Sequence, residues 1–160
     1  MLDSWNNIIF TPVKKQKQGT LRKKSAKKKE LGRYKSGLEK NCADMLRDAK
    51  IKFVYETQEF LLVPKFKYDG VYHKMTPKSK GMTDRTGRDV LPIRYTPDFL
   101  APDGSWIIET KGYTPSHHDF TMRWKLFLAL LVNREEPLPA LFICKNRFQI
   151  AEAIKIIKGL

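Results

Sequence analysis

The stretch RYTPDFLAPDGSWIIETK, residues 94–111, decides the fold. Its β-branched and aromatic side chains predict two strands, 94–100 and 105–111. Residues 101–104 between them read Ala-Pro-Asp-Gly, and the proline and glycine suit a tight turn. The stretch therefore predicts a β-hairpin.

Three charged side chains of this hairpin are expected to converge on one patch. Side chains alternate along a strand, so Glu109 and Lys111 point to the same face. Folding the hairpin about its turn places Asp98 opposite residues 107–109. Two carboxylates can hold Mg²⁺, a hard cation that prefers oxygen ligands, while the lysine can orient or deprotonate an attacking water. These are the parts that phosphodiester hydrolysis needs, although an isolated E-x-K is also common as an ordinary ion pair on an exposed strand face.

The segments around the hairpin predict the layers that cover it. They predict helices over 36–49, 117–133 and 147–158, one or two strands within 51–63, and a short strand over 139–144. We expect the second helix to be heavily buried, and we expect Trp124, Phe127 and Phe148 to belong to the core rather than to stack on bases. The order indicates an α/β fold with a mixed central β-sheet flanked by helices.

Residues 64–92 interrupt this pattern. They hold several prolines and glycines among many charges. This composition is typical of a long loop or a flexible hairpin, inserted into the folded domain. We expect the insertion to contact the substrate.

The charge of the chain points to a polyanionic partner. Its 160 residues carry 31 Lys or Arg against 17 Asp or Glu, which leaves a net charge of +14. The length allows one domain with an extension. A charge of this size and sign is typical of proteins that bind nucleic acid, so nucleic acid, DNA or RNA, is the predicted partner.

Most of this charge lies near the N-terminus, because residues 1–35 alone have a net charge of +9. We divide the chain into a basic, flexible N-terminal arm, 1–33, and a folded domain, 34–160. Like charges at this density repel one another, so the arm is expected to be mobile until phosphates neutralise it. A solvated tail that aids solubility or directs localisation is the alternative. The predicted nucleic-acid contacts are Lys14, Lys15, Lys17, Arg22, Lys23, Lys24, Lys27, Lys28, Lys29, Arg33 and Lys35.

Other classes of protein are disfavoured. The longest apolar run, Leu126–Val132, is far below the roughly 20 residues that span a bilayer, and the N-terminus lacks the layout of a signal peptide. Cys42 and Cys144 form no C-x-x-C pair, so we interpret them as small core residues in a reducing compartment. We therefore expect no membrane partner and a cytoplasmic location.

Three further residues carry two interpretations each. Ser36-x-x-Glu39 is a capping box, in which Glu39 bonds back to the Ser36 backbone, but Glu39 could also add a carboxylate to the patch. His117 and His118 could bind zinc or act as a base, or could form a polar helix start. From spacing alone we favour the cap for Glu39 and the polar helix start for the histidines.

Four motifs together resemble a known family. They read YKSGLE at 34–39, IKFVYE at 51–56, YTPDFL at 95–100 and IETKG at 108–112. In this order they are similar to the successive motifs of the bacteriophage endonuclease I family of Holliday-junction resolvases, within the PD-(D/E)xK nuclease superfamily. The resemblance covers roughly residues 33–135.

The resemblance implies a restriction-endonuclease-like fold and a Mg²⁺-dependent DNA endonuclease, with Mn²⁺ as a substitute, that acts on branched DNA in recombination. It implies that Asp98 and Glu109 bind the metal and that Lys111 assists the water. It also implies that Glu39 completes the metal site, alone or while capping its helix.

The chain also departs from that family. Its insertion, 64–92, is longer than the corresponding segment of the resolvases, and little chain follows Cys144. A homodimer and selectivity for branches are therefore less firmly implied than cleavage. A transposon-end or repair endonuclease of the same superfamily, and a non-catalytic nucleic-acid-binding phage protein, stay open as alternatives.

Overall fold

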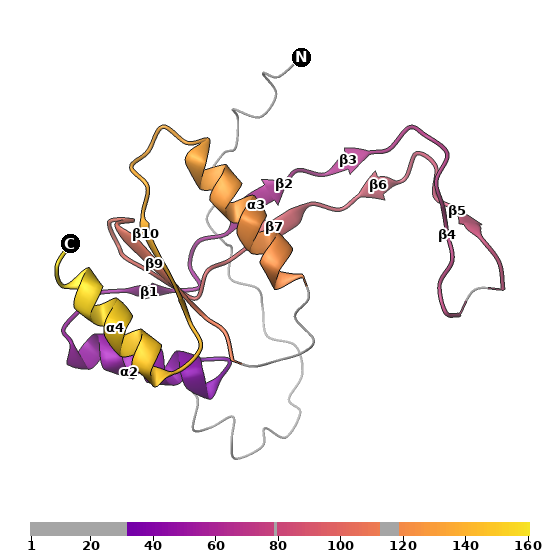
Figure 1. Ribbon diagram of the computed structural model, residues 1–160. Helices are drawn as coiled ribbons and strands as arrows, with labels where there is room; N and C mark the ends of the chain where they lie inside the picture. Colours follow the sequence, from indigo (N-terminus) through magenta and orange to yellow (C-terminus); the bar gives the residue numbers. More distant parts are fainter. Residues whose placement is uncertain (1–31, 79, 113–118) are drawn as a thin grey trace.

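The computed structural model describes residues 32–78, 80–112 and 119–160 (Figure 1). The chain is a mixed α/β protein, as the sequence predicts. Its helices in this part are α2 (Gly37–Asp48), α3 (Phe120–Val132) and α4 (Arg147–Ile157). Its strands are β1 (Val54–Tyr55), β2 (Phe60–Val63), β3 (Phe66–Lys67), β4 (His73–Lys74), β5 (Thr83–Asp84), β6 (Asp89–Val90), β7 (Ile93–Tyr95), β8 (Phe99–Leu100), β9 (Trp106–Thr110) and β10 (Ala140–Cys144).

The central sheet has the strand order β1-β8-β9-β10. Strand β8 is antiparallel to both β1 and β9, whereas β10 runs parallel to β9. The predicted hairpin is confirmed at β8 and β9. Gly104 donates its backbone N–H to the Ala101 carbonyl at 3.1 Å and has a φ of +78°, a conformation that glycine adopts without steric cost.

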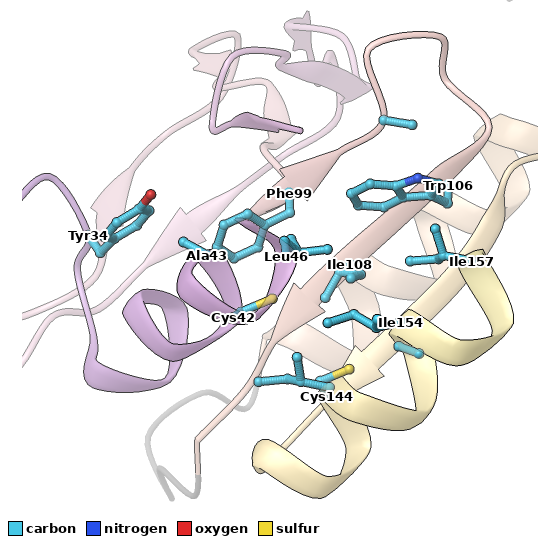
Figure 2. Packing of buried hydrophobic residues seen from close by; sticks show 13 residues of the cluster. Tyr34, Cys42, Ala43, Leu46, Phe99, Trp106, Ile108, Cys144, Ile154 and Ile157 are labelled. Carbon is cyan, nitrogen blue, oxygen red and sulfur yellow. The ribbon is translucent and has the colours of Figure 1, made fainter. Parts of the chain in front are cut away.

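The two faces of the sheet are covered by different helices, because side chains alternate along β8 and β9. Phe99 and Ile108 belong to a cluster formed with α2 and α4, which Figure 2 shows around Leu46 and Ile154. Leu100 and Ile107 point the other way and pack in a second cluster, which includes Phe127 of α3. The sheet therefore lies between α2 and α4 on one face and α3 on the other.

One predicted strand, 94–100, is wrong as a single element. Its first part is β7, which pairs with β2, and its last part is β8, which pairs with β1 and β9. Pro97 lies between them, is fully buried and has no N–H to donate to a ladder. The break at this proline lets the chain pass from one sheet into the next.

The insertion, 64–92, is a hairpin. Strands β3 and β6 pair antiparallel, as do β4 and β5, and both pairs follow on from β2 and β7 (Figure 1). We refer to residues 64–92 as the ribbon; Ser79 in it lies outside the described residues. Figure 1 shows the ribbon projecting away from the central sheet and its helices.

Two expectations about the later helices need correction. Helix α3 buries Phe127 and Leu131, but Met122 and Val132 are exposed, so the helix is not heavily buried. On α4, Phe148 is 73% exposed and is not a core residue. The helix turns its buried positions Ile150, Ala153, Ile154 and Ile157 inward, and Phe148 lies off that stripe.

The predictions about the start of α2, the two cysteines and Trp124 are confirmed. Helix α2 begins after the N-cap Ser36, and Cys42 and Cys144 are buried, free thiols. Trp124 packs against the cluster of α3. No helix in the described part of the chain is long and apolar enough to cross a membrane.

Candidate active site

Asp98 and Glu109 lie opposite each other where the chain enters β8 and where β9 ends. The register pairs Phe99 with Ile108, so one step further along the hairpin Asp98 lies opposite Glu109. The backbone N–H of Asp98 donates to Glu109 Oε2 at 3.3 Å, and both side chains are buried. The structure thus brings the two acids together, as the pattern of the hairpin predicts.

Asp98 is held by Thr110. The backbone N–H and the hydroxyl of Thr110 both donate to Asp98 Oδ2, at 2.7 and 2.6 Å. Burial raises the pKa of Asp98 to about 7, and the neighbouring charge of Glu109 adds to this rise, whereas the Thr110 hydrogen bonds oppose it. Burial and the charge of Glu109 thus outweigh the two Thr110 hydrogen bonds, and the ionised form of Asp98 is less stable in the protein than in water.

Glu109 is 2% exposed and has three described partners. Its Oε2 accepts from the Tyr95 hydroxyl at 2.7 Å, besides the Asp98 N–H, and its Oε1 pairs with Lys111 Nζ at 2.6 Å. Burial and the charge of Glu109 raise the pKa of Tyr95 above its ordinary value, so this phenol stays a hydrogen-bond donor. Glu109 is thereby fixed in one orientation.

Lys111 lies on the same side of the chain as Glu109, as the alternation of a strand predicts. Its Nζ is also 4.6 Å from the ring centroid of Phe120, at the start of α3. The side chain is 29% exposed, compared with 2% for Glu109. Lys111 can therefore reach a polar group that approaches from solvent while it remains paired with the acid.

Glu39 is buried in the first turn of α2 and takes part in capping the N-terminus of this helix. Its N–H donates to Ser36 Oγ at 3.1 Å, the first half of the capping box. The return bond differs from the expectation: Glu39 Oε2 accepts from the Lys35 N–H at 2.8 Å instead of the Ser36 N–H, and it also accepts from the Tyr55 hydroxyl. Tyr55 lies on β1 and draws the carboxylate toward the sheet.

The charge of Glu39 reaches Asp98, although no hydrogen bond among the described residues joins Glu39 to Asp98 or Glu109. The Glu39 carboxylate is one of the smaller causes that raise the pKa of Asp98. Helix α2 packs on the face of Phe99 and Ile108, whereas Glu109 follows the alternate face. The structure therefore groups Asp98, Glu109 and Lys111, and the role of Glu39 as a metal ligand stays a prediction.

The acid pair meets the minimum that a divalent ion requires. Within residues 32–78, 80–112 and 119–160, no three His, Cys, Asp or Glu side chains gather to hold a metal ion by themselves. Mg²⁺ keeps several waters and is commonly bound through one or two carboxylates together with substrate phosphates. Asp98 and Glu109 meet that lower requirement, since both are buried acids and one of them has a raised pKa.

Two residues of this site could not be found by sequence reasoning. Tyr95 and Thr110 hold the acids through a hydroxyl each. Thr110 is the middle residue of E-x-K, and Tyr95 comes three residues before Asp98, but neither pattern predicts a hydrogen bond. Their partners lie on another strand, so the contacts depend on the register of the hairpin.

Most of the predicted basic contacts lie outside the described residues, as do His117 and His118. Of the two that are described, Lys35 is exposed and paired with Glu56. Arg33 lies over the rings of Tyr34 and Tyr55, at 5.3 and 5.8 Å from the ring centroids. The contacts of the arm with nucleic acid stay a prediction.

Comparison of the chain with protein-family models, curated proteins and solved structures finds no match. The function must therefore be inferred from the geometry of Asp98, Glu109 and Lys111, together with the charge of the chain.

Proposed function

We propose that the protein is a Mg²⁺-dependent, structure-selective DNA endonuclease that hydrolyses phosphodiester bonds in branched DNA. The observation that carries the proposal is the buried pair of Asp98 and Glu109, with Lys111 Nζ 2.6 Å from Glu109 and partly exposed. In a chain with a net charge of +14, such a group suits a phosphodiester.

We also propose that the fold is of the PD-(D/E)xK type. Three features support this assignment: a first helix with a buried glutamate, a hairpin that pairs an aspartate with a glutamate, and a lysine two residues after that glutamate. The parallel pairing of β9 with β10 and the helices on both faces are compatible with it.

The residues of the site would divide the chemistry among them. Asp98 and Glu109 would hold Mg²⁺, which when bound polarises the phosphodiester and stabilises the charge that develops on its oxygens. Lys111 would orient the attacking water and stabilise the hydroxide that forms from it, because its ammonium group donates hydrogen bonds and is held by Glu109; the proton of the water would pass to solvent. Tyr95 and Thr110 would keep the carboxylates in place.

A substrate panel tests the proposal. Four-way junction, flap, mismatch and linear duplex DNA are incubated with the protein, in Mg²⁺ and in a chelator. We expect Mg²⁺-dependent cleavage, fastest on the branched substrates. Cleavage confined to linear ends favours a transposon-end enzyme, and cleavage at mismatches favours a repair enzyme. Products formed equally in the chelator would contradict metal dependence.

A second candidate is a non-catalytic DNA-binding protein. The lack of a three-residue metal group in the described part of the chain favours it, together with the +9 charge of residues 1–35. Titration with Mn²⁺, followed by calorimetry, separates the two candidates. We expect binding that Glu109→Gln abolishes; a wild-type protein that binds no Mn²⁺ near neutral pH, with or without DNA, would favour the binder.

A further inference from the structure

The ribbon is a basic and largely exposed part of the chain. It holds seven Lys or Arg and three Asp, a net charge of +4 over 64–92. Most of its described side chains are exposed, including Val71 at 80% and Met82 at 68%. A long two-stranded ribbon with this exposure has little to bury within its own chain. These features indicate that the ribbon is a binding surface for another molecule.

An open cavity of about 220 Å³ lies on the surface of the ribbon and is lined by residues of both its arms. Its charged lining consists of Lys74, Arg85 and Arg88 against the single acid Asp89. Asp89 is already paired, since its Oδ2 lies 2.7 Å from Lys65 Nζ and this contact holds its pKa below the ordinary value. The cavity therefore has an excess of positive charge.

Arg85, which belongs to this lining, also carries an unsatisfied donor. Its Nε is buried and has no hydrogen-bond partner among the described residues. A buried guanidinium N–H without an acceptor costs free energy, and an anion oxygen would relieve that cost. The excess of positive charge in the lining is the observation that indicates an anion, and a shift of the Arg85 side chain would bring its Nε–H to the same anion.

The local backbone places both arginines at this cavity. The Arg85 N–H donates to the Tyr72 carbonyl at 2.7 Å, and the Arg88 N–H donates to the Arg85 carbonyl at 3.1 Å, which closes a turn. Gly87 in that turn has a φ of +66°, a conformation that favours glycine. The turn is anchored to the opposite strand, because the Tyr72 N–H donates to Thr86 Oγ1 at 3.1 Å.

We propose that this cavity binds a backbone phosphate of duplex DNA and so anchors the ribbon in a groove. We name DNA as the partner because its negative charge complements the positive lining of the cavity. This inference rests on the proposed function, in which DNA is the substrate. A two-stranded ribbon fits the major groove, and arginine pairs with phosphate through two parallel N–H donors. A second copy of the chain fits less well, because two ribbons of +4 would repel each other.

The ribbon is also connected directly to the site. Strand β7 ends at Tyr95, whose hydroxyl contacts Glu109. DNA that the ribbon holds would therefore be positioned relative to the acid pair by one continuous stretch of chain. The ribbon is in this way a positioning element for the substrate.

The test compares two full-length triple variants of equal charge. Lys74→Gln/Arg85→Gln/Arg88→Gln neutralises the cavity, and Lys145→Gln/Lys155→Gln/Lys158→Gln removes three charges at and next to α4. Fluorescence anisotropy with labelled duplex DNA, in a chelator so that nothing is cut, gives the affinity as salt is varied. We expect the cavity variant to bind at least about fivefold more weakly, with a log–log salt slope that is shallower by about 0.9 for each phosphate that the variant no longer neutralises. The α4 variant should keep the wild-type slope.

Three results would overturn the inference. The cavity variant could bind DNA with the affinity and salt slope of the wild type, both variants could lose affinity equally, or the cavity variant could change its oligomeric state without losing DNA affinity. If the triple variant does not fold, as judged by circular dichroism, the single variants Arg85→Gln and Arg85→Lys decide instead. Gln should weaken binding more than Lys, and equal, wild-type binding by both would overturn the inference. Cleavage by the wild-type protein is measured separately in Mg²⁺, so a failure of the cavity and a failure of the nuclease are distinguished.

Discussion

Asp98 and Glu109 have different partners for their carboxylates. Both are buried, and Lys111 pairs with Glu109 but not with Asp98 in the described contacts. The pKa of Asp98 rises to about 7 because burial and its neighbour both oppose a negative charge. Above about pH 7 the ionised Asp98 is therefore expected to destabilise the metal-free fold, and in the proposed function a bound cation offsets this cost.

This leads to a prediction about the stability of the metal-free protein. The folded pKa of Asp98 lies above its unfolded value of 3.8, so its favourable contribution is complete below about pH 4 and is lost as the pH rises toward 7. Asp98→Asn keeps the acceptor for Thr110 and removes the ionisation. We expect this variant to be more stable than the wild type by about 1–3 kcal/mol at about pH 8 in a chelator.

Urea unfolding measures this difference. The gap should shrink toward about pH 4, where Asp98 is largely protonated in the folded wild type, and Mg²⁺ should stabilise only the wild type. A variant that is less stable than the wild type at about pH 8 would show that the Asp98 carboxylate is satisfied without a metal.

Tyr95 gives a second prediction at this scale. Tyr95→Phe keeps the ring against Trp124 and Phe127 and removes the donor to Glu109 Oε2. A hydrogen bond to a charged group is worth about 1.5–3 kcal/mol, so we expect cleavage to fall about tenfold or more and the Mg²⁺ needed for half-maximal rate to rise.

Tyr34→Phe is the matched control, because the Tyr34 hydroxyl is bonded to Arg47 instead of an acid of the site. It should leave the Mg²⁺ dependence unchanged. An equal effect of both substitutions would mean that Tyr95 acts only through general stability.

At the scale of elements, the start of α2 matters for both the fold and the site. The Ser36 hydroxyl caps the helix by accepting from the Glu39 N–H, and losing an N-cap costs about 1 kcal/mol. Ser36→Ala should therefore lower the free energy of unfolding by about 1 kcal/mol. It should also slow cleavage if Glu39 contributes to the site, since the first turn that positions Glu39 is loosened.

Asn146→Ala provides the comparison, because Asn146 caps α4 in the same way through the Gln149 N–H. Its loss should cost a similar free energy, measured by urea unfolding, and leave cleavage unchanged at a temperature where both variants are folded. A Ser36 variant that cuts at the wild-type rate would assign Glu39 to capping alone.

Some contacts between elements could be predicted from the sequence and others could not, for physical reasons. The hairpin of β8 and β9 follows from local chemistry, because the Ala-Pro-Asp-Gly turn sets the register that brings Asp98 to Glu109. The return bond of Glu39 to Lys35 and Tyr55 could not be predicted, since it depends on how β1 lies against α2. Likewise Pro97 divides one apparent strand between two sheets, and only the pairing partners reveal the division.

At the scale of the whole molecule, charge is distributed over two regions that we expect to meet DNA. Residues 1–35 carry +9 and the ribbon carries +4 of the total of +14. The acid pair lies on the central hairpin, directly after the strand that leaves the ribbon. We therefore expect affinity to come from the basic residues and chemistry to come from the buried acids and one lysine.

This separation predicts the effect of neutralising the arm. Replacing Lys23, Lys24, Lys27, Lys28 and Lys29 by Gln in the full chain should weaken DNA binding strongly at physiological salt and make the salt slope shallower. At low salt and saturating protein, the rate of cleavage should be close to that of the wild type. Anisotropy gives the first quantity and single-turnover cleavage the second; loss of the saturated rate would place part of the catalytic machinery in the arm.

The most direct measurement is single-turnover cleavage of a labelled four-way junction by the wild type and by Asp98→Asn, Glu109→Gln and Lys111→Gln, with binding measured on the same samples. We predict that the wild type cuts in Mg²⁺, while each variant binds the junction but cuts at least about a hundredfold more slowly, a loss of about 2.7 kcal/mol or more in transition-state stabilisation. Cleavage by all three variants at the wild-type rate, or a purified wild-type protein that binds Mg²⁺ and DNA and never cuts, would contradict the assignment of this site to a nuclease.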